Sequence, residues 1–192
     1  FIDTLFLSPL LFPARPYHAL LKDDKLLTDE LNNPLNDSIK AKDLFYDEVS
    51  AFLRSDEQLK QIFYALLQDK IEFRAFFSYL GYQADNVDIE EVIRQRFYGR
   101  ICGKANVGDM VSEYPIELAY CLALIHCNDR YSITPPWVLK TYPDVERIMY
   151  LLKSNPCLSG CDYCNDSLNI HNALKRFFGF ESYRTYAGEP LQ

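Results

Sequence analysis

The sequence predicts a mainly α-helical protein that begins with a short β-strand. Apolar residues recur at helical spacing through most of the chain, and only 7 glycines are present in 192 residues. Hydrophobic residues make up 48% of the chain and aromatic residues 15%, which is enough to build a packed core. This composition excludes a disordered or low-complexity protein.

The elements follow in order from these patterns. The strand is expected within residues 1–10, where Ile2, Leu5 and Leu7 are apolar and Pro9 ends the run, and residues 11–36 are expected to be irregular. A new element is expected to begin at Pro135-Pro136-Trp137, and a last helix capped by Asp166 or Ser167 is expected to end near Phe178. Amphipathic or apolar helices are predicted at residues 37–53, 57–68, 70–80, 89–98, 115–127 and 143–153.

Charge and hydropathy limit the possible partners. A net charge of −7 argues against a protein that wraps DNA over its whole surface. No apolar run reaches 18 residues and the first 13 residues lack a basic region, so we expect a cytoplasmic protein without a membrane partner. The oligomeric state stays open. The densest positive run either contacts a DNA backbone or forms a solvated helix face; it consists of Arg94, Arg96, Arg100 and Lys104.

Three cysteines crowd into eight residues near the C-terminus. Cys157, Cys161 and Cys164 have the spacing C-x3-C-x2-C, which favours metal binding over a disulfide framework where no secretory signal is visible. We expect a structural zinc ion, which needs a fourth ligand. His171 is the nearest candidate, and Cys127 and Cys102 are the alternatives. The same spacing also resembles the iron–sulfur motif of radical SAM enzymes, which implies a [4Fe–4S] cluster instead.

Residues 32–45 resemble the third exonuclease motif of DnaQ-like, DEDD-type 3′→5′ exonucleases, through Asp37, Ser38, Ala41 and Leu44-Phe45. Residues 2–5 resemble the strand that precedes this motif, which implies the end of an α/β exonuclease fold. The resemblance implies that Asp37 binds catalytic Mg²⁺ or Mn²⁺. The family's general base falls at Asn32 or Asn33, and neither can act as a base near pH 7. The family's other acids would precede Phe1, so these residues alone are not expected to be active.

Residues 173–184 run Ala-Leu-Lys-Arg-Phe-Phe-Gly-Phe-Glu-Ser-Tyr-Arg and resemble the opening motif of RecQ-family DNA helicases. In that family the motif holds the adenine of ATP. The resemblance implies that Phe180 stacks on the base, Arg184 fixes the local geometry and Gln192 reads the hydrogen-bonding edge of adenine. No phosphate-binding loop lies within the 192 residues.

Together these patterns predict a segment of an ATP-dependent DNA helicase and 3′→5′ exonuclease fusion that acts on DNA in repair or recombination. Alternatively, the chain is a non-catalytic, zinc-stabilised helical module that binds nucleic acid or protein. A radical SAM iron–sulfur enzyme is the third hypothesis. The expected divisions are an exonuclease end, a helical connector, a cysteine knuckle and a helicase start, at residues 1–54, 55–154, 155–171 and 172–192.

Overall fold

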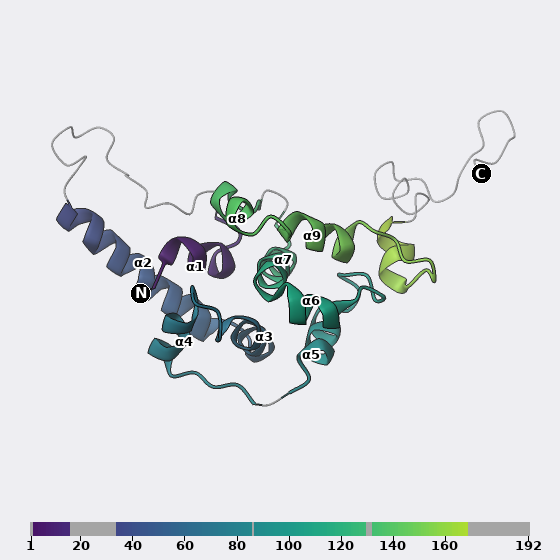
Figure 1. The fold of residues 1–192 in the computed structure, drawn as a ribbon, viewed down its shortest axis with the longest axis horizontal. Coiled ribbons are helices and arrows are strands. Elements are labelled where there is room, and N and C mark those ends of the chain that lie inside the picture. Colours follow the sequence, from purple (N-terminus) through teal and green to yellow (C-terminus); the bar gives the residue numbers. More distant parts are fainter. Residues whose placement is uncertain (1, 16–33, 86, 130–131, 169–192) are drawn as a thin grey trace, which may run out of the picture.

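A computed structural model describes residues 2–15, 34–85, 87–129 and 132–168. The helical prediction is confirmed, since every regular element in these ranges is a helix (Figure 1). In chain order the helices are α1 (Thr4–Leu11), α2 (Pro34–Arg54), α3 (Glu57–Leu67), α4 (Arg74–Leu80), α5 (Ile89–Arg96), α6 (Val107–Glu113), α7 (Pro115–Cys127), α8 (Pro136–Thr141), α9 (Val145–Lys153) and a π-helical turn, η1 (Cys164–Leu168).

Helix α7 forms the centre of the fold. Its sequence has no polar face, so it is stable as a helix only where other helices surround it. It packs against α1, α3, α6 and α9, and eight of its residues are buried. Pro115 begins the helix, where its missing N–H costs nothing, and Asn128 ends it in the left-handed conformation at φ 52°.

The strand predicted within residues 1–10 is wrong, because Thr4–Leu11 is a helix. The Asp3 side chain caps this helix by accepting a hydrogen bond from the backbone N–H of Leu5 at 2.9 Å. Leu7 and Leu10 are 2% and 4% exposed, and their separation of three residues places both on one face of a helix. Residues 7–10 are all buried, so the C-terminal half of this helix is enclosed by the fold.

Pro9 lies inside α1, where a proline normally breaks a helix. The absent N–H of Pro9 leaves the carbonyl of Leu5, four residues earlier, without its helical donor. The indole Nε1 of Trp137 in α8 donates to this carbonyl at 3.2 Å, and the Tyr120 hydroxyl in α7 donates to the next carbonyl, that of Phe6, at 2.9 Å. Trp137, from the second half of the chain, thus compensates for the proline, and Tyr120 adds a second bond to the same helix.

Aromatic rings join α2 to α4 and to Tyr82, which follows α4. Phe52 is 1% exposed and packs edge-on against Phe76, Phe77 and Tyr82, with ring centroids 5.4–5.8 Å apart. Helix α4 ends at Gly81, which takes φ 63° as expected for a glycine that stops a helix. The first half of α2 extends away from the body of the protein (Figure 1).

One continuous core includes residues from the predicted exonuclease end, connector and knuckle. The boundaries at 54 and 154 stay predictions, but the described parts of these segments share this core. Helix α6, which Asn106 caps, was not expected from the sequence. In the part of the chain that the structure describes, no helix combines the length and apolar character that a membrane crossing needs.

Candidate metal centre

Four cysteine side chains meet at one end of the fold. The Sγ atoms of Cys102, Cys157, Cys161 and Cys164 all lie within 4.8 Å of one another. Cys102 comes from the loop between α5 and α6, and the other three come from the loop after α9 and the start of η1. The site therefore connects two segments that are separated by more than fifty residues in the sequence.

Backbone hydrogen bonds hold Cys102 in place. Its N–H donates to the carbonyl of Leu152 at 2.8 Å, which fixes the loop against the last turn of α9. The guanidinium of Arg94 donates to the carbonyls of Gly103 at 3.1 Å and Ala105 at 2.9 Å, and it also pairs with Glu90. Arg94 thus shapes the loop that presents Cys102.

The knuckle loop turns at Gly160, which has φ 63°. The Gly160 N–H donates to the carbonyl of Cys157 at 3.1 Å, and the side-chain amide of Asn165 donates to the Gly160 carbonyl at 2.6 Å. A Cβ atom at position 160 would lie 2.8 Å from the Asn165 Oδ1. The left-handed backbone conformation therefore favours glycine here, and any side chain would also have to displace the amide of Asn165.

Two tyrosines attach the knuckle to the helical body. The buried Tyr163 hydroxyl donates to the carbonyl of Lys153, the last residue of α9, at 2.8 Å. The exposed Tyr98, which follows α5, donates its hydroxyl to the carboxylate of Asp162. The loop is therefore tied to both helices that flank the cysteine cluster.

Backbone N–H groups point at the sulfur atoms. Gly103 N–H donates to the Cys161 Sγ and Cys161 N–H donates to the Cys157 Sγ, both at 3.2 Å, and Cys157 N–H lies 3.4 Å from the Cys164 Sγ. Such donors stabilise the negative charge of thiolates. They are the arrangement expected around a site that binds a cation through ionised cysteines.

The four thiols differ in how readily they ionise. The N–H of Cys161 lowers the pKa of Cys157 to about 6. Burial opposes ionisation of Cys161, but the hydrogen bonds from the Cys164 and Gly103 backbone outweigh it and lower its pKa. Burial raises the pKa of Cys102 and raises that of Cys164 to about 12. A bound cation would offset this effect of burial, because it deprotonates its thiol ligands.

Of the proposed fourth ligands, the structure places Cys102 in the cluster. Cys127 lies elsewhere, with its Sγ 3.4 Å from the Ser132 Oγ, and His171 lies outside the described residues. In the sequence, Cys102 differs from Cys121 and Cys127 in that a loop with Gly103 follows it, while the other two lie within an apolar helix.

The other predicted site residues are not brought together. Asp37 lies in the first turn of α2 and is exposed, and the four cysteines form the one group of potential metal ligands found among the described residues. Asn32, Asn33, Phe180, Arg184 and Gln192 lie outside those residues, so their predicted roles stay predictions.

The basic run does not form one surface. Arg94 and Arg96 lie two positions apart on α5 and face different sides. Arg96 donates to the Asp56 carboxylate at 3.0 Å and lies 3.1 Å from the His126 Nδ1, while Arg100 donates to the carbonyls of Ile125 and His126. The remaining member, Lys104, is exposed beside the cysteine cluster.

Comparisons with known proteins give no relative from which a function could be transferred. No family profile matches the chain, and neither a curated protein nor a solved structure matches it significantly.

Proposed function

We propose that this chain is a non-catalytic helical module, stabilised by one structural zinc ion, within a DNA-processing protein. The observation that supports this most directly is the convergence of four cysteine Sγ atoms within 4.8 Å. Closed structural zinc sites hold four protein ligands, and four cysteine thiolates are one of the usual sets, whereas catalytic zinc sites keep one position open for water or substrate. A full set of four cysteines leaves no such position.

The spacing of the sulfurs favours a single ion over an iron–sulfur cluster. With zinc–sulfur bonds of 2.3 Å, the sulfurs of a tetrahedral site lie about 3.8 Å apart. The Sγ atoms of Cys161 and Cys102 lie 3.9 Å apart. In a [4Fe–4S] cluster each thiolate binds a different iron, so the sulfurs spread more widely. A radical SAM cluster would also leave one iron without a cysteine, and here a fourth cysteine is present.

The zinc ion would act as a staple between two loops. It would join the α5–α6 loop, through Cys102, to the knuckle after α9, through the other three cysteines. The backbone N–H of Cys102 donates to the carbonyl of Leu152, and the Tyr163 hydroxyl donates to the carbonyl of Lys153. Metal binding is therefore expected to order the end of α9 as well as the knuckle.

Thiol counting on the purified chain tests this proposal. With zinc bound, a thiol reagent should modify Cys127 quickly, because it is half-buried and lies outside the cluster. Cys121, which is 0% exposed, should react only on unfolding. Removal of the metal by a chelator should release four more reactive thiols and about one zinc ion per chain, measured by elemental analysis.

Hydrogen exchange provides the structural measurement for the same experiment. Chelation should raise the exchange rates of the α5–α6 loop, the end of α9 and the knuckle, and leave α3 and α4 protected. A chain that holds no metal at neutral pH and has equal exchange with and without chelator would contradict the proposal. If the purified chain is brown and contains iron and sulfide, the site holds an iron–sulfur cluster and not zinc.

The helicase motif supports a second, more specific proposal, in which the parent protein is a RecQ-type helicase. The residues that carry it are Phe180, Arg184 and Gln192. If Phe180 stacks on adenine, Phe180→Ala in the full-length protein should raise the KM for ATP about fivefold or more, because base–aromatic stacking contributes roughly 1–3 kcal/mol. An unchanged KM in steady-state ATPase assays would exclude this role, and equal zinc content in both proteins would show that the knuckle is unaffected.

A further inference from the structure

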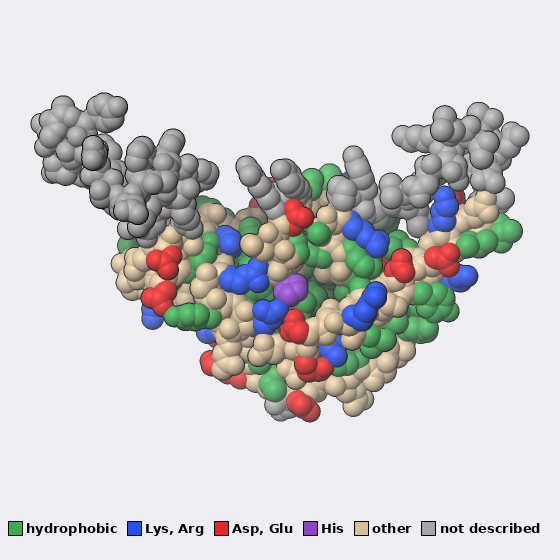
Figure 2. Space-filling view, turned by 180° about the vertical axis from the view of Figure 1, so that it is seen from behind, with side chains coloured by type: hydrophobic (Ala, Val, Ile, Leu, Met, Phe, Trp, Pro, Cys, Tyr) green, Lys and Arg blue, Asp and Glu red, His purple; other side chains and the backbone are tan. Residues whose placement is uncertain are grey.

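Positively charged side chains gather at the C-terminal end of α7. Arg96, Arg100 and Lys153 are all half-buried there, beside the half-buried His126. The face in Figure 2 shows Lys and Arg side chains around the histidine, with apolar side chains in the depression beside it. In a protein with a net charge of −7 this concentration of positive charge is local and opposite in sign to the whole.

The protein itself neutralises only part of this charge. Asp56 pairs with Arg96 at 3.0 Å, and the carbonyls at the end of α7 accept hydrogen bonds from Arg100. A helix C-terminus carries only about half a negative charge. Around His126 three cations therefore face the Asp56 carboxylate and one helix end, while Asp129 and Glu146 lie along the groove beyond them.

Lys153 is the cation with the weakest compensation. It lies 5.4 Å from the centre of the Tyr163 ring and forms no ion pair with any residue that the structure describes. Burial, followed by the neighbouring Arg100, lowers the pKa of Lys153. A cation that is partly removed from water beside another cation gains free energy when an anion binds to both.

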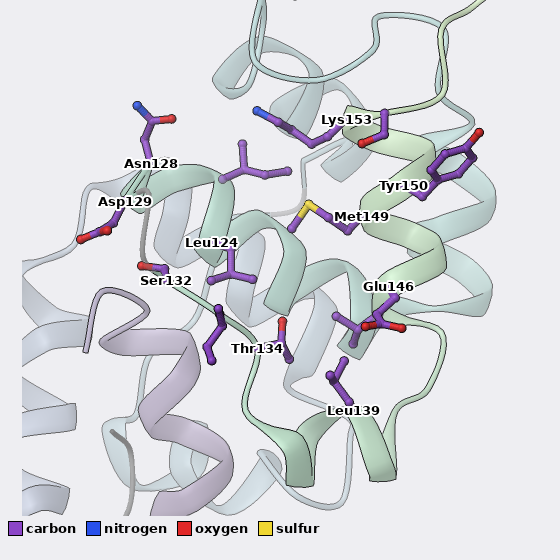
Figure 3. Close-up of a pocket in the computed structure, with 14 residues that line it drawn as sticks. Leu124, Asn128, Asp129, Ser132, Thr134, Leu139, Glu146, Met149, Tyr150 and Lys153 are labelled. Atoms are coloured by element: carbon purple, nitrogen blue, oxygen red, sulfur yellow. The ribbon is translucent and has the colours of Figure 1, made fainter. Parts of the chain in front are cut away.

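An open groove of about 740 Å³ begins at Lys153 and runs between α7 and α9. Figure 3 shows Lys153 at one end of the groove with its amine directed toward the side of Asn128, while Leu124 and Met149 lie below it. Ser132 and Thr134 add hydroxyl groups to the wall, and the carboxylates of Asp129 and Glu146 also line the groove. The groove therefore has an apolar floor, a few polar groups, two carboxylates, and Lys153 at one end.

This combination fits one class of ligand. Single-stranded nucleic acid has a phosphate at each residue and an unpaired, flat base beside it, and it binds proteins through cations and apolar or aromatic surfaces together. In a duplex the faces of the bases are covered by their neighbours, so a base could not enter the groove. We propose that Lys153, Arg100 and Arg96 bind the backbone phosphates of a single strand, with a base in the groove between α7 and α9.

The inference deepens the proposed function, because the choice of ligand rests on a DNA-processing parent protein. It also changes which basic residues are expected to contact nucleic acid. Of the basic run in the sequence, Arg96 and Arg100 belong to this surface together with Lys153, whereas Arg94 is occupied in the Cys102 loop and Lys104 lies beside the cysteines.

Fluorescence anisotropy of a labelled oligothymidine with the zinc-loaded chain tests the site. The substitution Lys153→Gln should weaken binding and reduce the slope of log K against log salt by about 0.7, the value for one lost phosphate contact on a single strand. The matched control is Lys104→Gln, which removes an exposed lysine from the cysteine end and should change neither quantity. Met149→Glu places a charge in the groove and should weaken binding of the strand. A duplex of the same length should bind the unmodified chain less tightly than the single strand does.

The outcomes separate the two proposals. Equal affinity and slope for Lys153→Gln and the unmodified chain, or equal losses for Lys153→Gln and Lys104→Gln, would overturn the site, provided that circular dichroism and zinc content are unchanged. If Met149→Glu binds the strand with unchanged affinity, the proposed role of the groove is wrong. A chain that binds the strand through Lys153 but contains no metal would support the site and contradict the zinc module, and a zinc-loaded chain that binds no strand would do the reverse.

Discussion

Replacing Cys102 with serine is expected to weaken zinc binding by more than about 100-fold, beyond the 10–100-fold that loss of an outer-shell partner costs. Cys102 supplies one of the four sulfurs and is the one ligand from the α5–α6 loop. A 100-fold weaker affinity removes about 2.7 kcal/mol of metal-linked stability at a fixed excess of zinc. For a chain of this size the Tm should fall by about 5–10 °C. Competition with a coloured chelator measures the affinity, and calorimetry measures the Tm.

The matched control for this experiment is Cys127→Ser. Cys127 is also a free, partly accessible cysteine, but its Sγ contacts Ser132 and not the cluster. Its substitution should leave zinc affinity unchanged. If Cys102→Ser keeps full affinity while His171→Ala loses it, the fourth ligand is His171, and the role assigned to Cys102 is wrong.

The second large effect is expected at Glu48, a carboxyl group buried where α2 packs against α1. Glu48 is 0% exposed, and its two carboxylate oxygens have no hydrogen-bond partner among the described residues. Burial raises its pKa to about 8, which Arg15 opposes, and Asp3 and Asp47 contribute in the same direction as burial. The folded protein therefore holds a proton that the unfolded chain would lose near pH 4.5.

This difference makes the protein less stable as the pH rises. The stability that the protonated Glu48 carboxyl group contributes is fully present below about pH 4.5. It is lost progressively up to about pH 8, because Glu48 ionises at lower pH in the unfolded chain than in the folded protein. At pH 7 the loss amounts to about 3 kcal/mol. Glu48→Gln cannot ionise, so it should be more stable than the natural protein by about this amount at pH 7 and nearly equal to it at pH 4. Urea unfolding at several pH values measures both.

Glu113→Gln serves as the comparison, because Glu113 is exposed at the end of α6. It should follow the pH dependence of the natural protein. If Glu48→Gln and Glu113→Gln give parallel curves, another group causes the pH dependence and the carboxyl of Glu48 is solvated or paired in solution.

The sequence predicted those elements that are determined by residues close together in the chain. The apolar run of α7 has the observed bounds of Pro115–Cys127, and Gly81 ends α4, because a buried helix and a glycine stop each depend on neighbouring residues. The three cysteines of the knuckle were recognised for the same reason. The fourth was left open among three candidates, because the pairing of two distant loops depends on tertiary structure.

The errors also have physical causes. The apolar residues Ile2, Leu5 and Leu7 and the break at Pro9 suggested a strand, but Asp3 caps a helix there. The helix contains Pro9, and Trp137 supplies a donor to the carbonyl of Leu5 that the proline leaves without one. The basic run was left open between a DNA contact and a solvated helix face, and the structure divides its members between different sides because neighbouring positions on a helix point in different directions. Glu48 gave no signal, since a glutamate in an amphipathic helix is normally exposed.

The compensation of Pro9 has a consequence for the order of folding. The two bonds that satisfy α1 span 132 and 114 residues of sequence, from Leu5 to Trp137 and from Phe6 to Tyr120. Contacts of such long range carry the largest loop-closure cost and tend to form late. Helix α1 can pack against α2 early, but its contacts with α7 and α8 can form only after those helices have taken their places. During synthesis the carbonyl of Leu5 would therefore lack its indole donor until Trp137 had emerged from the ribosome.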